Sequence, residues 1–185
     1  MNELGDRFEI LMRSGSRYAE PVVINQVKVD LERGFTPGKM EFEVLITEDT
    51  KVDVGNPVRF KVDGKVFFYG YVFKMKPTKE NTLKLTCYDQ LRYLKNKDTY
   101  IYQDITYSQL LKRICSDTGL TLGDVQDTKF KIVGRVEENK EYYEMLKVAY
   151  EETLSKTNKI FVLYDKGGNI CLQDINSLKV NDFIL

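Results

Sequence analysis

Two pairs of adjacent glutamates are the residues of this sequence with the most evident capacity for acid–base chemistry. They are Glu137-Glu138 and Glu151-Glu152. Two carboxyl groups can act as general acid and general base on a glycosidic bond when burial raises the pKa of one of them. Neighbouring residues on a helix do not face each other, so neither pair forms such a couple by itself. The sequence favours solvated helix surface for both pairs.

The sequence contains no histidine, and this removes several kinds of catalysis together. Ser-His-Asp and Cys-His nucleophilic sites, HExxH zinc sites and histidine proton shuttles all need an imidazole. The glycine-rich phosphate-binding motifs and the nucleophile-elbow motif are also missing from the 185 residues. We therefore predict a protein that is not an enzyme, with no catalytic residue, no cofactor and no metal site.

Three cysteines stand far apart in the sequence, at Cys87, Cys115 and Cys171. No two of them form a CxxC pair, and an odd number does not complete a disulfide framework. Two lie in alternating apolar runs and one lies in a helical stretch. We expect all three to be reduced and buried, because a free thiol packs as a small hydrophobic group.

The stretch 66–73 is typical of a β-strand with apolar residues on both faces, and it is the candidate interaction surface. Successive side chains of a strand point to opposite faces, so the aromatic residues at its odd positions share one face. Either the protein buries both faces itself, or another subunit covers one of them, and the sequence leaves both alternatives open. We assign to this surface Phe67, Tyr69, Tyr71, Phe73, Lys74 and Lys76.

A modest basic cluster accompanies these aromatic residues, since Lys79 and Lys84 follow Lys74 and Lys76. Aromatic and basic residues together can bind nucleic acid, and lysines can also meet an acidic partner. A solvated strand face is the simpler interpretation. The chain has 28 basic and 28 acidic residues, so we expect no nucleic-acid specificity. It has no run of 18 apolar residues, so we expect no membrane insertion.

Alternating apolar residues and turn signals predict that the first half of the chain consists of β-strands. Asp63-Gly64 is a strong signal for a two-residue hairpin turn, which needs positive φ at both positions. Pro37-Gly38 is a second turn signal. No helical pattern separates the strands, which indicates an antiparallel sandwich or barrel. The expected strands are 8–13, 22–31, 40–46, 58–62, 66–73 and 82–89.

After Asp89 the apolar pattern changes to the period of a helix. Thr106 and Gln109 predict a capping box at the start of a first helix, and Gly119 ends it. A second helix is expected over 139–159, where Asn139 could be the N-cap. A strand, a turn and a strand follow over 160–175, and a short extended segment is expected near 128–134.

Four tyrosines mark the change of pattern and are assigned to a domain junction. A tyrosine suits a seam between packed units, because its ring is apolar and its hydroxyl can stay hydrated. We place the boundary at residue 97, which gives a β domain over 1–97 and an α+β domain over 98–185. The expected fold class is therefore α+β. The junction residues are Tyr88, Tyr93, Tyr100 and Tyr102.

Four stretches, in this order, resemble the baseplate hub proteins of contractile phage tails. They are "PGKMEFEV", "VGNPVRFKVDGKVFFYGYVFKM", "LTCYDQLRYLKNKDTYIY" and "ITYSQLLKRICSDTGL". The resemblance is to the late control D-like hub of the defective-prophage and bacteriocin tails of Gram-positive bacteria. It runs from about Phe8 to Ile175, and its most specific parts are the hairpin around Asp63-Gly64 and the "CYDQLRYL" join.

The resemblance implies an antiparallel tail-tube-like β-barrel followed by an inserted α+β domain with two helices and a β-hairpin. It implies a structural subunit in the tail or baseplate of a phage or a tail-like particle, made in the bacterial cytoplasm. Three subunits would form a hub that joins the six-fold tail tube to the three-fold spike and lines the central channel. The implied partners are further copies of the protein, the tail tube protein and the spike protein.

The sequence departs from the family pattern at its end. It stops at "SLKVNDFIL", where the family implies a continuation into a second barrel. We therefore expect a truncated chain that is monomeric by itself and has an exposed sheet edge or apolar patch. Two other functions stay open. One is a tail-associated cell-wall hydrolase that uses a carboxylate pair, and the other is a surface-binding module for glycan or nucleic acid.

Overall fold

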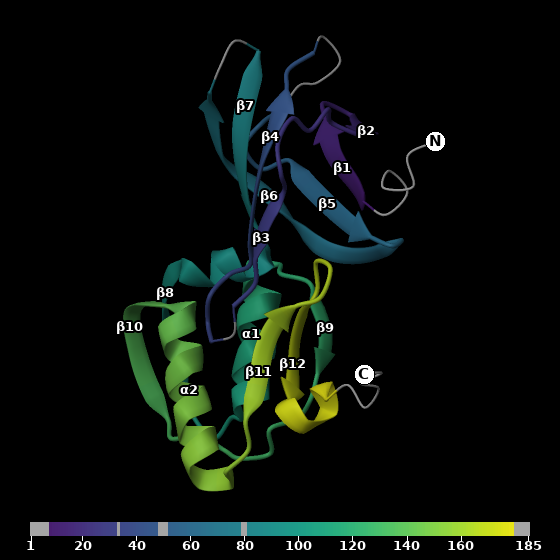
Figure 1. The fold of residues 1–185 in the computed structure, drawn as a ribbon. Helices are drawn as coiled ribbons and strands as arrows, with labels where there is room; N and C mark the ends of the chain where they lie inside the picture. Colours follow the sequence, from purple (N-terminus) through teal and green to yellow (C-terminus); the bar gives the residue numbers. More distant parts are fainter. Residues whose placement is uncertain (1–7, 33, 48–51, 79–80, 180–185) are drawn as a thin grey trace. The chain divides into compact units, whose positions relative to one another are not determined.

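The computed structural model describes residues 8–32, 34–47, 52–78 and 81–179. By their contacts the residues form two units, which Figure 1 shows as a β-rich unit and a unit with the helices α1 and α2. The first unit comprises 1–32, 36–92 and 165–168, and the second comprises 33–35, 93–164 and 169–185. The sequence places a domain boundary at residue 97, whereas the contacts change unit after Arg92.

The first unit contains one antiparallel sheet with the strand order β2-β1-β5-β6-β7-β4-β3. Among the described residues the sheet has two ends, β2 and β3, and no pairing of these ends closes it into the expected barrel. The strands are β1 (Phe8–Ser14), β2 (Arg17–Ala19), β3 (Lys28–Asp30), β4 (Lys39–Leu45), β5 (Pro57–Val62), β6 (Lys65–Pro77) and β7 (Thr82–Tyr88).

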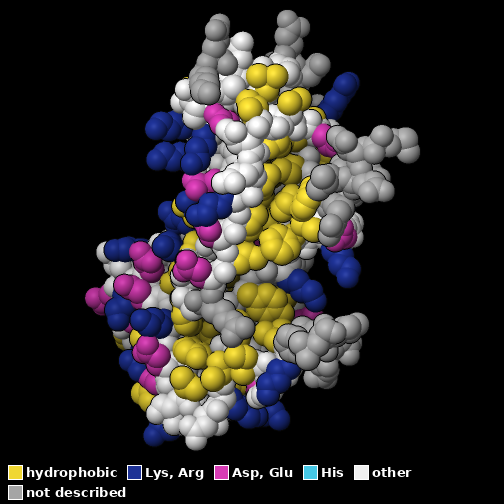
Figure 2. Space-filling view, viewed as in Figure 1, with side chains coloured by type: hydrophobic (Ala, Val, Ile, Leu, Met, Phe, Trp, Pro, Cys, Tyr) yellow, Lys and Arg dark blue, Asp and Glu magenta, His cyan; other side chains and the backbone are white. Residues whose placement is uncertain are grey.

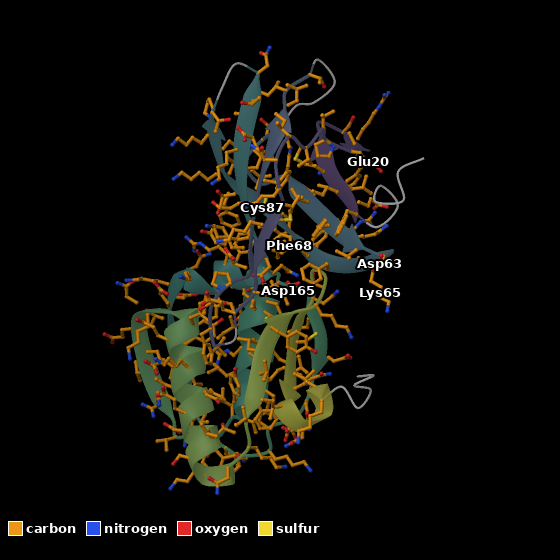
Figure 3. All side chains as sticks on the ribbon, viewed as in Figure 1. Glu20, Asp63, Lys65, Phe68, Cys87 and Asp165 are labelled. Carbon is orange, nitrogen blue, oxygen red and sulfur yellow. The ribbon has the colours of Figure 1, made fainter. Side chains whose placement is uncertain are left out.

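The core of the first unit follows from the alternation of apolar residues. Met40, Phe42 and Val44 of β4 are fully or almost fully buried, and the residues between them are half-buried. Phe68 and Cys87, from β6 and β7, belong to the same core (Figure 3). Each strand therefore turns one face to a common apolar interior, as its period of two predicts.

The hairpin turn predicted at Asp63-Gly64 is confirmed. Asp63 has φ 48° and Gly64 has φ 75°, so both residues adopt the left-handed conformation that this turn requires. Val62 and Lys65 pair directly on either side of it. Figure 3 shows Asp63 and Lys65 at the tip of the β5–β6 hairpin.

Two sequence predictions in the first unit are wrong. The single strand expected over 22–31 is replaced by the short strand β3 and an isolated bridge between Val23 and Val44. The turn expected at Pro37-Gly38 is absent, and the chain bends at 34–35 instead. Gly38 is buried, and its N–H donates to the side chain of Asp89, 51 residues away, a partner that no local pattern reveals.

The second unit contains the helices α1 (Tyr107–Thr118) and α2 (Tyr142–Thr157), which contact each other. The capping box of α1 is confirmed, since Thr106 and Gln109 exchange both hydrogen bonds. Gly119 ends α1 in the left-handed conformation. Neither helix, in the part of the chain that the structure describes, is long and apolar enough to cross a membrane.

The N-cap expected at Asn139 is wrong, because Glu141 caps α2. Asn139 instead lies inside β10 (Arg135–Glu141), at an irregularity of the strand pairing. It has φ 50°, a conformation that Asn tolerates better than most residues. A strand thus occupies the sequence directly before the helix.

The hairpin predicted over 160–175 is present as β11 (Phe161–Asp165) and β12 (Ile170–Asp174). It forms a three-stranded sheet with β9 (Leu122–Val125), in the order β11-β12-β9. A separate two-stranded sheet pairs β10 with β8 (Lys97–Tyr102). Two short 3-10 helices complete the described chain, η1 (Gln90–Lys95) and η2 (Ile175–Leu178).

The three cysteines are free and buried, as expected. Burial raises the pKa of the Cys87 thiol and of the Cys115 thiol to about 12. A thiol with such a high pKa is protonated near neutral pH and is a poor nucleophile. These cysteines serve as small apolar side chains of the two cores.

Candidate interaction surface

Four aromatic side chains form a row on the β6–β7 part of the sheet. The rings of Tyr69 and Tyr71 meet edge to face at 5.8 Å, and those of Phe73 and Tyr88 meet in the same way at 5.5 Å. Tyr71 and Tyr88 are direct partners across the two strands. Such edge-to-face pairs stabilise by about 0.5–1.5 kcal/mol beyond the area they bury. We call Tyr69, Tyr71, Phe73 and Tyr88 the aromatic row.

A strand irregularity and an arginine side chain lie at one end of the aromatic row. The register of β6 against β7 shifts between Val72 and Lys74, so that Phe73 is an extra residue there. The Arg92 guanidinium lies 5.7 Å from the centre of the Phe73 ring and 6.0 Å from that of Tyr88. This is within the range of a cation–π interaction. The Arg92 guanidinium therefore stabilises the Phe73 and Tyr88 rings at the end of the row.

Phe67 was expected on the same face as the aromatic row, and the structure places it elsewhere. The register of β5 against β6 shifts between Phe60 and Lys61, which makes Phe67 an extra residue of β6. Its ring meets the buried ring of Phe60 edge to face at 6.1 Å. A bulge of this kind turns a side chain out of the alternation of its strand. Phe67 is 52% exposed and belongs to the hairpin end rather than to the row.

The predicted basic cluster is partly present. Lys74 and Lys76 are exposed on β6, and Lys76 lies directly opposite Lys84 of β7. Lys84 and Lys39 both contact Glu41 of β4, at 3.7 and 2.9 Å. Figure 2 likewise shows Lys and Arg interspersed with Asp and Glu along the first unit. Lys79 and the chain end at 180–185 lie outside the described residues.

Two of the four junction tyrosines are buried in the second unit, on β8. The Tyr100 hydroxyl donates to Asp117, and its ring lies 4.9 Å from the Arg113 guanidinium. The Tyr102 hydroxyl donates to Glu137 Oε1 at 3.2 Å. Tyr93 is half-buried, and burial raises its pKa. Tyr88 belongs to the first unit and the other three junction tyrosines to the second, and the junction role of the four stays a prediction.

The interpretation of Glu137 as solvated helix surface is wrong. Glu137 lies on β10 and is 2% exposed, whereas its neighbour Glu138 is exposed, because the two alternate along a strand. Lys140 Nζ lies 2.7 Å from the second carboxylate oxygen of Glu137. A buried carboxylate needs such a counterion and donors. Glu137 is therefore a structural carboxylate, bound on both oxygens.

The second glutamate pair does lie on a helix. Glu151 is exposed on α2 and lies 3.9 Å from Lys147, one turn earlier. Glu152 is ion-paired with Arg135 and also accepts a hydrogen bond from the Val133 N–H at 3.1 Å. The two carboxylates of this pair thus have separate partners. They are not arranged as an acid–base couple.

Sequence reasoning did not single out Asp89, the central residue of the "CYDQLRYL" join. Its carboxylate accepts hydrogen bonds from the Gly38 N–H at 2.8 Å and from the Leu91 N–H at 3.0 Å. Asp89 is 4% exposed, and burial raises its pKa to about 7. An Asp between the end of an alternating strand and the start of a helical turn is a usable local signal for the bond to the N–H two residues on, here Leu91. The bond to Gly38 has no such signal.

We expect Tyr102→Phe to lower the free energy of local unfolding by about 1–2 kcal/mol, because it leaves a buried carboxylate oxygen without its donor. Hydrogen exchange of the β8 and α1 amides measures this change. Tyr18→Phe is the matched control, because Tyr18 is 62% exposed. A similar loss in both variants would mean that the hydroxyl of Tyr102 has no particular role.

The fold of this chain is that of prophage tail proteins of known structure. The 43 kDa tail protein of prophage MuSo2 from Shewanella oneidensis aligns with 90% of this chain and 53% of its own, with a TM-score of 0.68 and 16% identity. Prophage tail protein gp18 from Listeria monocytogenes aligns with 95% of this chain and 54% of its own, with a TM-score of 0.58 and 12% identity. At these identities the similarity establishes the fold alone.

The chain belongs to the YqbQ-like family, whose family model matches residues 27–185. Phage-like element PBSX protein XkdQ of Bacillus subtilis (strain 168) is 30% identical to it over 158 residues. The alignment covers 82% of this chain and 48% of XkdQ. The chain therefore spans about half the length of this relative.

Proposed function

We propose that this chain is a structural part of the tail of a phage or a phage-tail-like particle, and that it belongs to the hub of the baseplate. In this role the protein joins the six-fold tail tube to the three-fold spike and contributes to the wall of the central channel. One observation carries the proposal. The alignments with solved prophage tail proteins cover at least 90% of the chain and so include residues of both units. The relationship to a protein of the phage-like element PBSX supports the same class.

The chemistry of the described residues supports a role in assembly. The partly or fully buried carboxylates of the two glutamate pairs, Glu137 and Glu152, are held by Lys140 and Arg135. Within the described ranges, no group of three or more His, Cys, Asp or Glu side chains could hold a metal ion. The aromatic row consists of packed rings whose contacts are structural. The proposal therefore assigns binding surfaces, rather than a catalytic centre, to this chain.

The exposed part of the predicted interaction surface is the proposed contact with the next protein of the particle. Phe67, Lys74 and Lys76 are exposed, at the hairpin end and along the outer part of β6. Tyr69, Tyr71 and Phe73 are half-buried and support this strand from the aromatic row. The proposed partners are the tail tube protein, the spike protein and further copies of the protein itself.

The copy number of the protein in its particle tests the hub role. We expect quantitative mass spectrometry of purified particles from the source strain to find three copies of this polypeptide per particle, because a hub adapts six-fold to three-fold symmetry. The tail tube protein, measured in the same sample, should be present in a multiple of six. Deletion of the gene should leave particles without a spike.

A copy number that equals that of the tube protein would contradict the hub role and indicate a tube subunit. Absence of the polypeptide from intact particles would contradict a structural role altogether. Normal spikes on the particles of the deletion strain would contradict the proposal that this protein joins the tail tube to the spike.

A further inference from the structure

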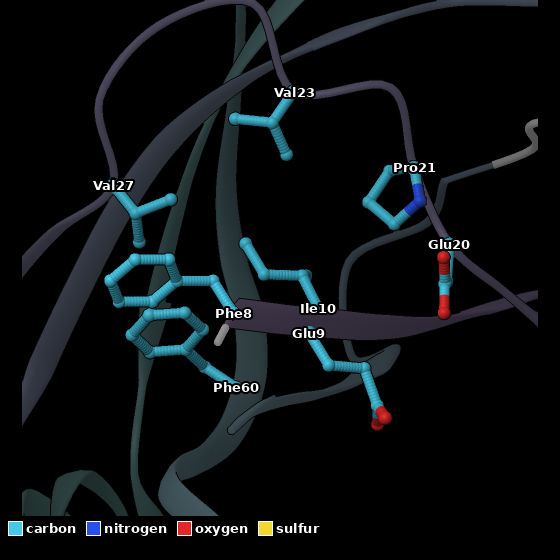
Figure 4. Close-up of a pocket in the computed structure, with 8 residues that line it drawn as sticks. All are labelled: Phe8, Glu9, Ile10, Glu20, Pro21, Val23, Val27 and Phe60. Carbon is cyan, nitrogen blue, oxygen red and sulfur yellow. The ribbon is translucent and has the colours of Figure 1, made fainter. Parts of the chain in front are cut away.

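An apolar pocket with a volume of about 400 Å³ opens in the first unit, between β1 and the segment 20–27 that leads into β3. Figure 4 shows Val23 and Val27 on one side of it, with Ile10, Phe8 and Phe60 on the other. We call it the seam pocket. Its lining residues are Phe8, Glu9, Ile10, Glu20, Pro21, Val23, Val27 and Phe60.

The surface around the seam pocket contains exposed and half-buried apolar side chains. Phe8 is 52% exposed, and its ring stacks on the buried ring of Phe60 at 6.1 Å with an angle of 10° between the planes. In Figure 2 hydrophobic side chains form a band along the β1 and β5 side of the first unit. A contiguous apolar patch of this kind marks an interaction surface more often than a scattered set of apolar residues does.

The main chain of β1 is open beside the pocket. β1 pairs with β5 from Phe8 to Met12, but with β2 only from Met12 to Ser14. Ser14 and Arg17 flank a two-residue turn, so the main-chain groups of Ser14 point toward β2. Every second residue of a strand directs its main-chain groups to the same side, so Phe8 and Ile10 do so too. No strand of the described chain lies opposite them there.

The facing segment is open in the same way. The Leu45 N–H donates to the Val22 carbonyl at 2.9 Å, and the Ile24 N–H donates to the Glu43 carbonyl at 3.0 Å. Residues 22 and 24 are therefore bound to β4. Val23, between them, directs its main-chain groups away from β4. In the described sheet no strand lies on that side of Val23.

We propose that the seam pocket is a strand-addition site, which takes one extended segment of another polypeptide between β1 and residues 22–24. The added strand would pair with the open main-chain groups of Phe8, Ile10 and Val23, as in other cases of β-augmentation. It would place every second side chain in the pocket and would connect β1 to residues 22–24 through main-chain hydrogen bonds. An occupant that brings no main-chain groups would leave both edges unpaired.

The charges of the pocket define the chemistry of the partner. Glu9 and Glu20 are the charged residues among those that line it. Glu9 already has an ion pair with Lys61 at 2.9 Å, whereas Glu20 is exposed and is ion-paired with no described residue. The complementary segment is therefore apolar at alternate positions and carries Lys or Arg next to them. Surface ion pairs of this kind add selectivity more than affinity.

Tryptophan fluorescence gives a direct test, because the protein itself contains no Trp. The probe is the end-blocked peptide Lys-Val-Thr-Trp-Thr-Lys, which can direct Val and Trp into the pocket. We expect a blue shift of its emission on titration with the protein, and slower hydrogen exchange at the amides of Ile10 and Val23. The same peptide with Pro in place of its first Thr lacks one main-chain donor and should bind at least about tenfold more weakly.

Three variants locate the binding. Val27→Glu places a charge in the pocket and should weaken binding at least about tenfold, whereas Val54→Glu, at a residue that is 61% exposed outside the pocket, should not. Glu20→Lys should weaken binding about two- to fivefold, as an exposed ion pair does. Circular dichroism checks that each variant keeps its fold.

Several outcomes would overturn the proposal. Equal binding of the proline peptide, or unchanged binding by Val27→Glu, would indicate adsorption to apolar surface. If light scattering showed that the protein self-associates and that Val27→Glu abolishes this association, the occupant of the pocket would be a second copy of the chain. Binding only after removal of residues 1–7 would assign it to the N-terminal end of the same chain.

Discussion

Gly70→Ala is expected to lower the free energy of unfolding of the first unit by about 3 kcal/mol or more. A Cβ atom at position 70 would lie 2.3 Å from the Tyr88 carbonyl oxygen and 2.7 Å from the Tyr88 carbonyl carbon. Both are main-chain atoms of the neighbouring strand, so the collision is not relieved by rotation of a side chain. The added methyl group must separate β6 from β7 and disturb the centre of the sheet.

Urea unfolding with hydrogen exchange of the β6 and β7 amides measures the effect of Gly70→Ala. Lys76→Ala is the control on the same strand, because Lys76 is exposed and faces Lys84, another positive charge. We expect the control to stay within about 0.5 kcal/mol of the natural protein. If Gly70→Ala were equally mild, β6 and β7 would not approach as closely as the structure shows.

Asp89→Asn is expected to destabilise the protein by about 1–3 kcal/mol. The carboxylate of Asp89 accepts the N–H groups of Gly38 and Leu91, one on each oxygen. An amide side chain has only one oxygen, so one of these two buried donors loses its acceptor. Urea unfolding at several pH values measures the loss. Asp53→Asn, at an exposed loop residue, is the matched control and should have little effect.

The pH dependence distinguishes the ionisation of Asp89 from its hydrogen bonds. Burial raises the pKa of Asp89 to about 7 from an ordinary value of 3.8. Between these pH values the folded protein holds a proton that the unfolded chain releases. Protonation of Asp89 therefore stabilises the folded state fully below about pH 4, and this contribution falls as the pH rises toward 7. Asp89→Asn cannot titrate. We therefore expect the difference in the free energy of unfolding between the natural protein and the variant to be larger at pH 5 than at pH 8.

The Asp165 carboxylate also raises the pKa of Asp89, so removal of the Asp89 charge changes the titration of Asp165 as well. The comparison therefore reports on this pair of acids. A stability difference that grew with pH would show that the native pKa of Asp89 is lowered, and that the charged carboxylate is the form that the fold favours. A constant difference would show that Asp89 acts only through its hydrogen bonds.

Features that depend on neighbouring residues were determined by the sequence itself. The turn at Asp63-Gly64 follows from the tolerance of Gly and Asp for positive φ, and both residues adopt it. The capping box of Thr106 and Gln109 joins residues three apart, so its geometry is complete within one helical turn. The buried face of β4 follows from the period of two. Similarly, the three cysteines are buried where two apolar runs and one helical stretch place them.

Tertiary structure decided which strands pair and which polar groups are buried. β8, β9 and β10 were not predicted, because short polar segments such as β10 become strands only when a partner strand satisfies their main chain. The burial of Glu137 follows from that pairing. The bulge at Phe67 redirects one aromatic side chain, since one extra residue reverses the alternation that a sequence pattern assumes.

The bond between Asp89 and Gly38, and the seam pocket between β1 and residues 20–27, have the same origin. Both depend on segments that are distant along the chain and meet only when the sheet curves around its core. A local pattern fixes the backbone conformation of a few residues and the face that each side chain takes. The contacts between distant segments depend on the free energy of the whole packed unit, which only the tertiary structure shows.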